Sequence, residues 1–192
     1  MKLVVVSAGL SVPSSTRLLA DRLAAAVVRR ADAEVDVQVI EVRDLAVEIA
    51  HHLTNGFPGQ ALAVAQDAVT GADGLIVVTP VFSASYSGLF KSFFDVLDKD
   101  ALTGKPVLLA ATGGTARHSL VLDHALRPLF SYLKAVAVPT GVYAASEDWG
   151  AEGLAQRIER AGRELASLMP KAERRTEPGV VPFAEQLAAL EP

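Results

Sequence analysis

The sequence contains no cysteine, which excludes disulfide bonds, a catalytic thiolate, and zinc or iron–sulfur sites built on cysteine. It also lacks a long basic run, and its net charge of −4 argues against a nucleic-acid partner. No apolar stretch approaches the roughly 20 residues of a membrane-spanning helix, and the first apolar run is too short for a signal peptide. These absences predict a soluble cytoplasmic protein with neither a nucleic-acid nor a membrane partner.

Several motifs of catalysis and nucleotide binding are absent as well. There is no Gly-x-Ser-x-Gly nucleophile elbow and no Gly-x-x-x-x-Gly-Lys-Ser/Thr phosphate loop, and Gly9 alone represents a Gly-x-Gly-x-x-Gly fingerprint. A receiver-type phosphorylation switch has acidic residues at the ends of its first and third strands. This chain has Ser7 and Thr79 there, which argues against such a switch. The adjacent His51 and His52 point in different directions on a helix or strand, which argues against joint metal binding.

What the sequence does have is a regular alternation of apolar strands and amphipathic helices. A length of 192 residues with 51% hydrophobic content suits one domain, residues 1–170, followed by a charged tail, residues 171–192. We predict strands at 2–7, 34–42, 74–79, 107–112 and 135–138, and we expect the last of these to continue past Pro139 toward Val142 and Tyr143. This alternation predicts an α/β fold: a doubly wound, five-stranded parallel sheet between two helical layers. Because the second strand alternates polar and apolar residues, it belongs at an edge, and the flavodoxin-like order 2-1-3-4-5 fits best.

The loop after the first strand is rich in hydroxyl groups: Ser11, Ser14, Ser15 and Thr16. A helix begins near Ser14 or Ser15, and the first N–H groups of a helix have no intrahelical partner and attract anions. The loop therefore predicts a site for a phosphate monoester. In the alternative interpretation, one serine caps the helix and the others are solvated.

Two further loops follow neighbouring strands in the predicted order, so all three converge on one crevice. The first holds Pro80, Val81, Phe82, Ser83 and Ser85, and the second Thr112, Gly113 and Gly114. Glycines without Cβ atoms allow a flat ring to approach closely, and a flat ring with one phosphate suggests flavin mononucleotide (FMN). Such a cofactor performs the hydride chemistry itself, so no catalytic side chain is required. His118 either hydrogen-bonds the flavin or a substrate, or is an exposed helical residue.

At these residues the chain resembles the NAD(P)H-dependent FMN reductases of flavodoxin-like fold. Pro80-Val-Phe-Ser83 stands for the family's Pro-Glu-Tyr-Asn segment, Ser87-Gly-Leu-Phe-Lys91 for its helix start, and Thr112-Gly-Gly114 for its last turn. The segment 79–91 most resembles an actinobacterial branch paired with luciferase-like monooxygenases. The loop lacks the family's arginine, whose positive charge Arg17 would replace.

The resemblance implies a flavoprotein oxidoreductase that transfers a hydride from NADPH or NADH to flavin N5 and supplies reduced flavin to a partner monooxygenase. It also implies that a backbone N–H near 83–85 or 113–114 stabilises the reduced ring. Two alternatives stay open: a quinone, azo or metal-oxyanion reductase that retains its FMN, and a non-enzymatic electron carrier of flavodoxin type.

The segment 89–97 predicts a helix with two apolar stripes. The stripes consist of Leu89, Phe93 and Val96 on one side, and Phe90, Phe94 and Leu97 on the other. A sheet can bury only one of these stripes. We therefore expect the second stripe to be covered either by a neighbouring loop or, as we favour, by another subunit. A homodimer or homotetramer is the resulting expectation.

Overall fold

The structure, a computed structural model, describes residues 1–169. The predicted tail, and with it the predicted boundary at residue 170, lies outside the described residues. Among the helices of the described part, none combines the length and the apolar character that crossing a bilayer requires.

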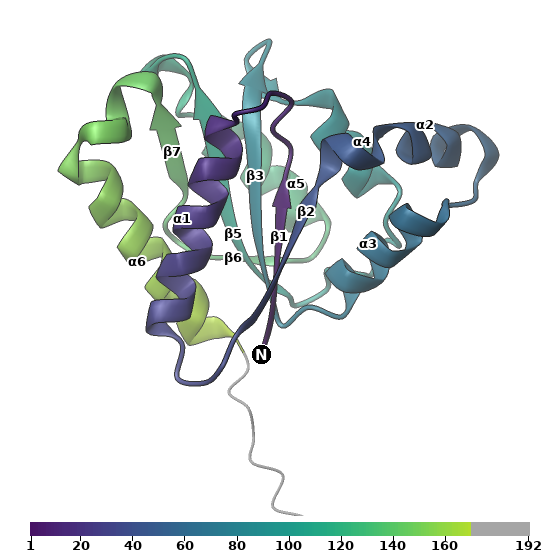
Figure 1. The fold of residues 1–192 in the computed structure, drawn as a ribbon, viewed down its shortest axis with the longest axis horizontal. Helices are drawn as coiled ribbons and strands as arrows, with labels where there is room; N and C mark the ends of the chain where they lie inside the picture. Colours follow the sequence, from purple (N-terminus) through teal and green to yellow (C-terminus); the bar gives the residue numbers. More distant parts are fainter. Residues whose placement is uncertain (170–192) are drawn as a thin grey trace, which may run out of the picture.

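A parallel sheet forms the centre of the molecule (Figure 1). Its spatial order is β2 (Asp36–Glu41), β1 (Lys2–Ser7), β3 (Gly74–Phe82), β5 (Pro106–Gly113) and β6 (Val136–Ala137). Each neighbouring pair runs parallel. The predicted doubly wound α/β class and its flavodoxin-like order are therefore confirmed.

The sheet has seven strands where the sequence predicted five. The fifth predicted strand is split, because β6 is followed by a separate β7 (Val142–Ala145) that also pairs with β5. Pro139 lies between the two and has no N–H to donate to the ladder. The second addition is β4 (Ser85–Tyr86), which folds back antiparallel on the end of β3.

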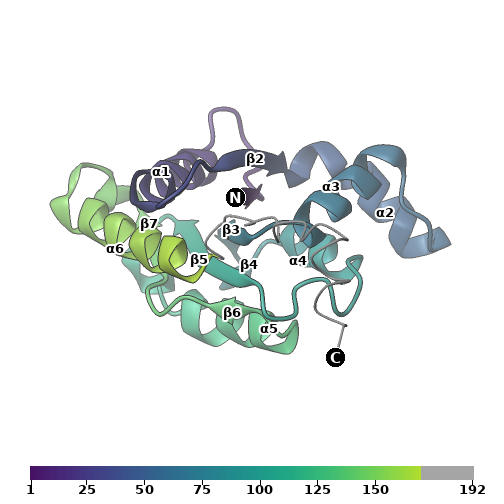
Figure 2. The same ribbon diagram turned by 90° about the horizontal axis from the view of Figure 1, so that it is seen from below.

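Side chains alternate between the two faces of the sheet, so each face builds its own core. On β1, Leu3 and Val5 belong to one core, and Val4 and Val6 to the other. The first core is covered by α1 (Ser15–Arg30) and α6 (Glu152–Leu168). The second is covered by α2 (Ala46–Asn55), α3 (Gln60–Thr70), α4 (Gly88–Asp95) and α5 (Arg127–Tyr132) (Figures 1 and 2). The three-layer arrangement is confirmed.

Both apolar stripes of α4 are buried within this chain. Phe94 is only 2% exposed, and its ring lies 5.0 Å from that of Phe130 on α5 and 4.8 Å from that of Phe90. The prediction that another subunit covers the second stripe is wrong, because α5 returns over α4 and supplies the cover. The oligomeric state stays a prediction.

The leucines at 122, 126, 129 and 133 recur at helical spacing and predict a helix from about His118, with a kink or a restart at Pro128. The structure forms this segment as turns of different kinds. A 3-10 turn, η2 (Ala116–His118), precedes a π-helical turn, η3 (Leu122–Leu126), and α5 begins with Pro128 in its first turn. The π-helical turn runs into α5 without a gap, so the helix does not restart at Pro128. The irregularity near the proline is the π-helical turn directly before it. His118 lies in the exposed 3-10 turn.

Candidate functional site

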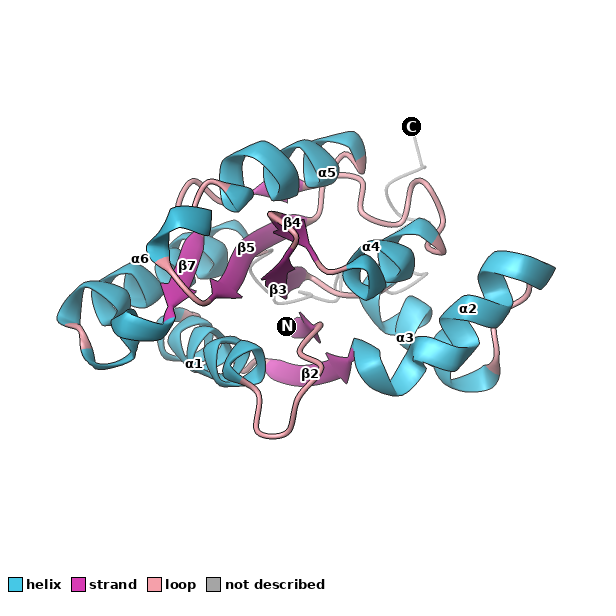
Figure 3. Ribbon diagram, turned by 90° about the horizontal axis from the view of Figure 1, so that it is seen from above, coloured by secondary structure: helices cyan, strands magenta, loops and turns pink. Residues whose placement is uncertain are grey.

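A cavity of about 410 Å³ opens at the carboxyl ends of β1, β3 and β5. Figure 3 looks onto this edge of the sheet, where the loop after β1, the β3–β4 hairpin and the turn after β5 lie close together. The cavity brings together ten of the predicted site residues: Ser11, Ser14, Ser15, Thr16, Pro80, Val81, Phe82, Thr112, Gly113 and Gly114.

Four predicted site residues lie outside the lining of this cavity: Arg17, Ser83, Ser85 and His118. Two lining residues, Leu10 and Ser146, were not predicted. Leu10 sits in the hydroxyl-rich loop, so the loop position itself was a usable signal. Ser146 directly follows β7, the part of the fifth strand that the sequence predicted beyond Pro139. The pairing of β7 with β5 brings Ser146 to the cavity.

The hydroxyl groups in the loop between β1 and α1 make different hydrogen bonds. Ser14 is the N-cap of α1, its Oγ accepting a hydrogen bond of 3.2 Å from the Arg17 N–H. Ser11 Oγ donates to the Pro13 carbonyl at 2.9 Å. Ser15 is exposed, and its hydroxyl makes no hydrogen bond within residues 1–169. It is thus the hydroxyl of this loop that no protein group uses within these residues.

Gly9 allows this loop to close tightly. A Cβ atom at Gly9 would lie 2.0 Å from Ser14 Oγ, a distance that no side chain tolerates. The loop therefore folds directly over the N-cap and leaves the first turn of α1 facing the cavity. In that turn the N–H groups of Ser15 and Thr16 have no intrahelical partner.

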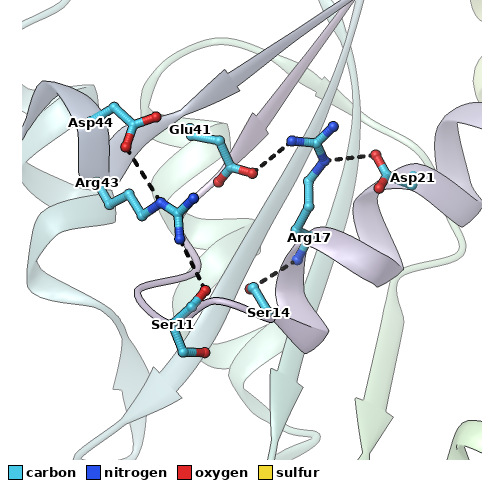
Figure 4. Close-up of polar contacts among 7 residues, drawn as sticks. All are labelled: Ser11, Ser14, Arg17, Asp21, Glu41, Arg43 and Asp44. Atoms are coloured by element: carbon cyan, nitrogen blue, oxygen red, sulfur yellow. Dashed lines mark hydrogen bonds and ion pairs between the residues drawn. The ribbon is translucent and has the colours of Figure 1, made fainter.

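Arg17 points away from the cavity, toward β2 (Figure 4). Its guanidinium is 2.8 Å from Glu41 Oε1 and 2.8 Å from Asp21 Oδ1. These hydrogen bonds, with Glu41 the larger contributor, raise the pKa of Arg17. The structure therefore does not support the prediction that Arg17 supplies positive charge to a bound phosphate.

Arg43 supports the same loop from outside. Its Nη1 donates to the Ser11 carbonyl at 3.0 Å, while its Nε lies 3.4 Å from Asp44 Oδ1 (Figure 4). Both arginines near the loop thus hold its framework, and no charged side chain lines the cavity within the described residues.

The second wall of the cavity is the β3–β4 hairpin. Ser83 and Ala84 form its turn with φ angles of 49° and 66°, a left-handed conformation that costs residues other than glycine energy. Phe82, 48% exposed, pairs with Ser85 and lines the cavity. Thr79 Oγ1 fixes the base of the hairpin by accepting from Ser87 N–H at 3.0 Å.

The third wall is the end of β5 and its turn. Thr112 Oγ1 lies 2.8 Å from Thr16 Oγ1, and this buried hydrogen bond joins the turn to α1. Gly113 and Gly114 offer only backbone to the cavity. The site therefore combines unpaired helix N–H groups at one end with side-chain-free backbone at the other. This arrangement fits a ligand with an anionic end and a flat end.

Comparison with known proteins points to one family. The family model for NADPH-dependent FMN reductases matches residues 1–150. An FMN reductase (NADPH) of Pseudomonas aeruginosa is 42% identical over 172 residues, covering 87% of this chain and 91% of that protein.

Two solved structures are similar along most of the chain. An oxidoreductase from Corynebacterium diphtheriae, 51% identical, superposes with a TM-score of 0.85 over 88% of this chain and 96% of that one. The apo form of an NADH:FMN oxidoreductase, EmoB, is 31% identical and has a TM-score of 0.81 over 90% and 91%.

Proposed function

The chain belongs to the NADPH-dependent FMN reductase family, and from this premise we propose that FMN binds in the cavity at the carboxyl ends of β1, β3 and β5. The protein is an NAD(P)H:flavin oxidoreductase. The observation that carries the site assignment is the meeting, in one cavity, of the free first turn of α1 with the Gly113–Gly114 backbone.

The phosphate of FMN fits the first turn of α1. The Ser15 and Thr16 N–H groups point out of the helix end, and the Ser15 hydroxyl has no other partner within residues 1–169. Ser14 holds this end in shape as the helix cap, whereas the Arg17 side chain is paired with Glu41 outside the cavity.

The flavin ring fits between the other two walls. Pro80, Val81 and Phe82 provide an apolar edge, and Gly113 and Gly114 offer backbone to a flat ring. At Gly114 the position of a Cβ atom is open space, so no side chain obstructs the ring there. Bound FMN supplies the hydride-accepting chemistry, and the contribution of the protein is to hold the ring with one face open to the nicotinamide.

The uncharged lining favours FMN that exchanges with solution. A phosphate held only by N–H and hydroxyl groups lacks the stronger hydrogen bonds of a guanidinium or ammonium. Arg17 and Arg43 are committed to other groups instead. We therefore propose that reduced flavin is released and supplied to a partner monooxygenase, rather than retained for a quinone or azo acceptor.

Binding and turnover test the proposal together. We expect FMN to bind more tightly than riboflavin, and Ser15→Ala to weaken FMN about tenfold or more, because a hydrogen bond to a charged group contributes about 1.5–3 kcal/mol. Riboflavin affinity should stay unchanged in that variant. Equal effects of Ser15→Ala on both flavins would place the phosphate elsewhere.

Steady-state assays separate release from retention. Free FMN should support oxidation of NADPH or NADH, compared side by side, faster than quinones or azo dyes do, and gel filtration should strip FMN from the protein. A yellow protein that keeps its flavin and prefers quinones would favour the retained-flavin alternative. Absence of any nicotinamide oxidation would favour the electron carrier.

A further inference from the structure

One tyrosine beside the candidate site holds the Gly113–Gly114 turn without lining the cavity itself. Tyr143 lies on β7, is 6% exposed, and donates its hydroxyl to the Thr115 carbonyl at 2.7 Å. Thr115 is the residue directly after the two glycines. The hydrogen bond therefore anchors the outgoing end of the turn to the neighbouring strand.

Gly113 is adapted to this tyrosine. A Cβ atom at Gly113 would lie 2.1 Å from Tyr143 Oη and 3.1 Å from its Cζ. The phenol ring thus occupies the space that a side chain at position 113 would need. The absence of a side chain at Gly113 therefore makes room for the tyrosine, which packs directly against the backbone of the turn.

The hydroxyl of Tyr143 remains a hydrogen-bond donor at physiological pH. Burial raises the pKa of Tyr143 above its ordinary value, and the carboxylates of Asp148 and Glu147 raise it further. Tyr143 also lines a second cavity of about 340 Å³, together with Asp148 and Arg157.

We propose that Tyr143 is a positioning residue that fixes the Gly113–Gly114 turn against the flavin ring. This role rests on the proposed function. Tyr143 acts through the turn, because it lies outside the lining of the flavin cavity. Its loss should affect recognition of the ring, whereas loss of Ser15 affects recognition of the phosphate.

Tyr143→Phe provides the first test, because it keeps the ring and removes only the hydroxyl. We expect the Kd of both FMN and riboflavin to rise by about two- to tenfold, the range that one neutral hydrogen bond supplies. The KM for FMN should rise by the same factor with kcat within about twofold of the wild type. Tyr132→Phe is the matched control, since Tyr132 is 84% exposed and should show no change.

A double-mutant cycle with Gly113→Ala provides the second test. Alone, Gly113→Ala forces its Cβ against the tyrosine hydroxyl and should weaken both flavins more than Tyr143→Phe does. In the Tyr143→Phe background the closest atom is Cζ at 3.1 Å, so the same substitution should weaken them less. The two effects should therefore be less than additive.

The outcomes separate this inference from the proposed function. Wild-type protein that neither binds FMN nor oxidises a nicotinamide nucleotide contradicts the proposed function. Wild-type protein that does both, with Tyr143→Phe giving unchanged Kd and KM for both flavins, overturns the positioning role. A lower melting temperature with unchanged Kd and KM also overturns it, because that result describes a purely structural tyrosine. If Tyr143→Phe does not fold, Gly113→Ala decides: unchanged flavin affinity overturns the role.

Discussion

Thr16 on α1 and Thr112 on β5 are 96 positions apart in the chain and share a buried hydrogen bond of 2.8 Å between their hydroxyl groups. Thr16 is 2% and Thr112 5% exposed. Each residue lies in a different wall of the candidate cavity, so this contact joins the proposed phosphate end to the strand that carries the glycine turn.

We expect Thr16→Val and Thr112→Val each to lower the free energy of unfolding by about 1–3 kcal/mol. Valine keeps the shape of threonine but leaves the partner hydroxyl buried without a hydrogen bond. The double variant should lose less than the sum, since no unpaired hydroxyl remains. Urea denaturation of the four proteins measures the coupling, and strictly additive losses would contradict it.

The position of the candidate cavity could be predicted from the sequence because it depends on strand order. The half-exposed strand at Asp36–Glu41 fixed an edge, and the order that follows brings three loops to one crevice. The roles of single side chains inside the crevice could not be predicted in this way. They depend on contacts such as that between Thr16 and Thr112, which no local pattern encodes.

Arg17 and Phe94 show the same limit. Helical spacing indicated that Arg17 belongs near the helix start, but the end of β2 places Glu41 within 2.8 Å of its guanidinium. Spacing also revealed the second apolar stripe on α4. It could not reveal that Phe130 of the same chain covers this stripe, because the cover arrives from more than thirty positions further along.

Ser7 and Thr79 form a natural comparison of two fully buried hydroxyl groups near the carboxyl ends of adjacent strands. Ser7 Oγ has no hydrogen-bond partner within the described residues, whereas Thr79 Oγ1 donates to the Pro80 carbonyl and accepts from Ser87 N–H. Ser7→Ala should therefore be neutral or stabilising by up to about 1 kcal/mol.

Thr79→Val should instead destabilise by about 1–3 kcal/mol, because it leaves the Ser87 N–H buried and unpaired. Thermal unfolding of both variants measures the contrast. A loss of more than about 1 kcal/mol for Ser7→Ala would show that its hydroxyl has a partner in solution, such as a buried water.

The hairpin turn should become more stable when its strain is removed. Ala84 has a φ of 66°, a conformation that costs about 1–2 kcal/mol for a residue with a side chain, while glycine adopts it freely at some cost in unfolded-state entropy. Ala84→Gly should thus raise the free energy of unfolding by up to about 1 kcal/mol. The KM for FMN should not change, because strand pairing rather than the turn holds Phe82.

Lys134→Gly is the matched control for this substitution. Lys134 also has a positive φ, of 61°, and lies at the opposite end of the sheet, beside the start of β6. It should give a similar gain, reduced by the loss of its exposed contact with Asp100. A fall in stability for Ala84→Gly alone would contradict the prediction. It would mean that the alanine side chain stabilises the hairpin by more free energy than its left-handed conformation costs.

Arg17 should matter for stability and not for phosphate binding. Arg17→Met leaves Glu41, whose side chain is 13% exposed, with an unpaired carboxylate. We expect a loss of about 1–2 kcal/mol, below the value of a fully buried pair because Arg17 itself is 39% exposed. Adding Glu41→Gln should restore most of this stability, because the neutral amide removes the unpaired negative charge.

In both variants the affinity for FMN should stay within about twofold of the wild type, measured by flavin fluorescence at low and high salt. A tenfold weaker, salt-sensitive affinity for FMN in Arg17→Met, with riboflavin unaffected, would show instead that the guanidinium leaves Glu41 when the phosphate binds.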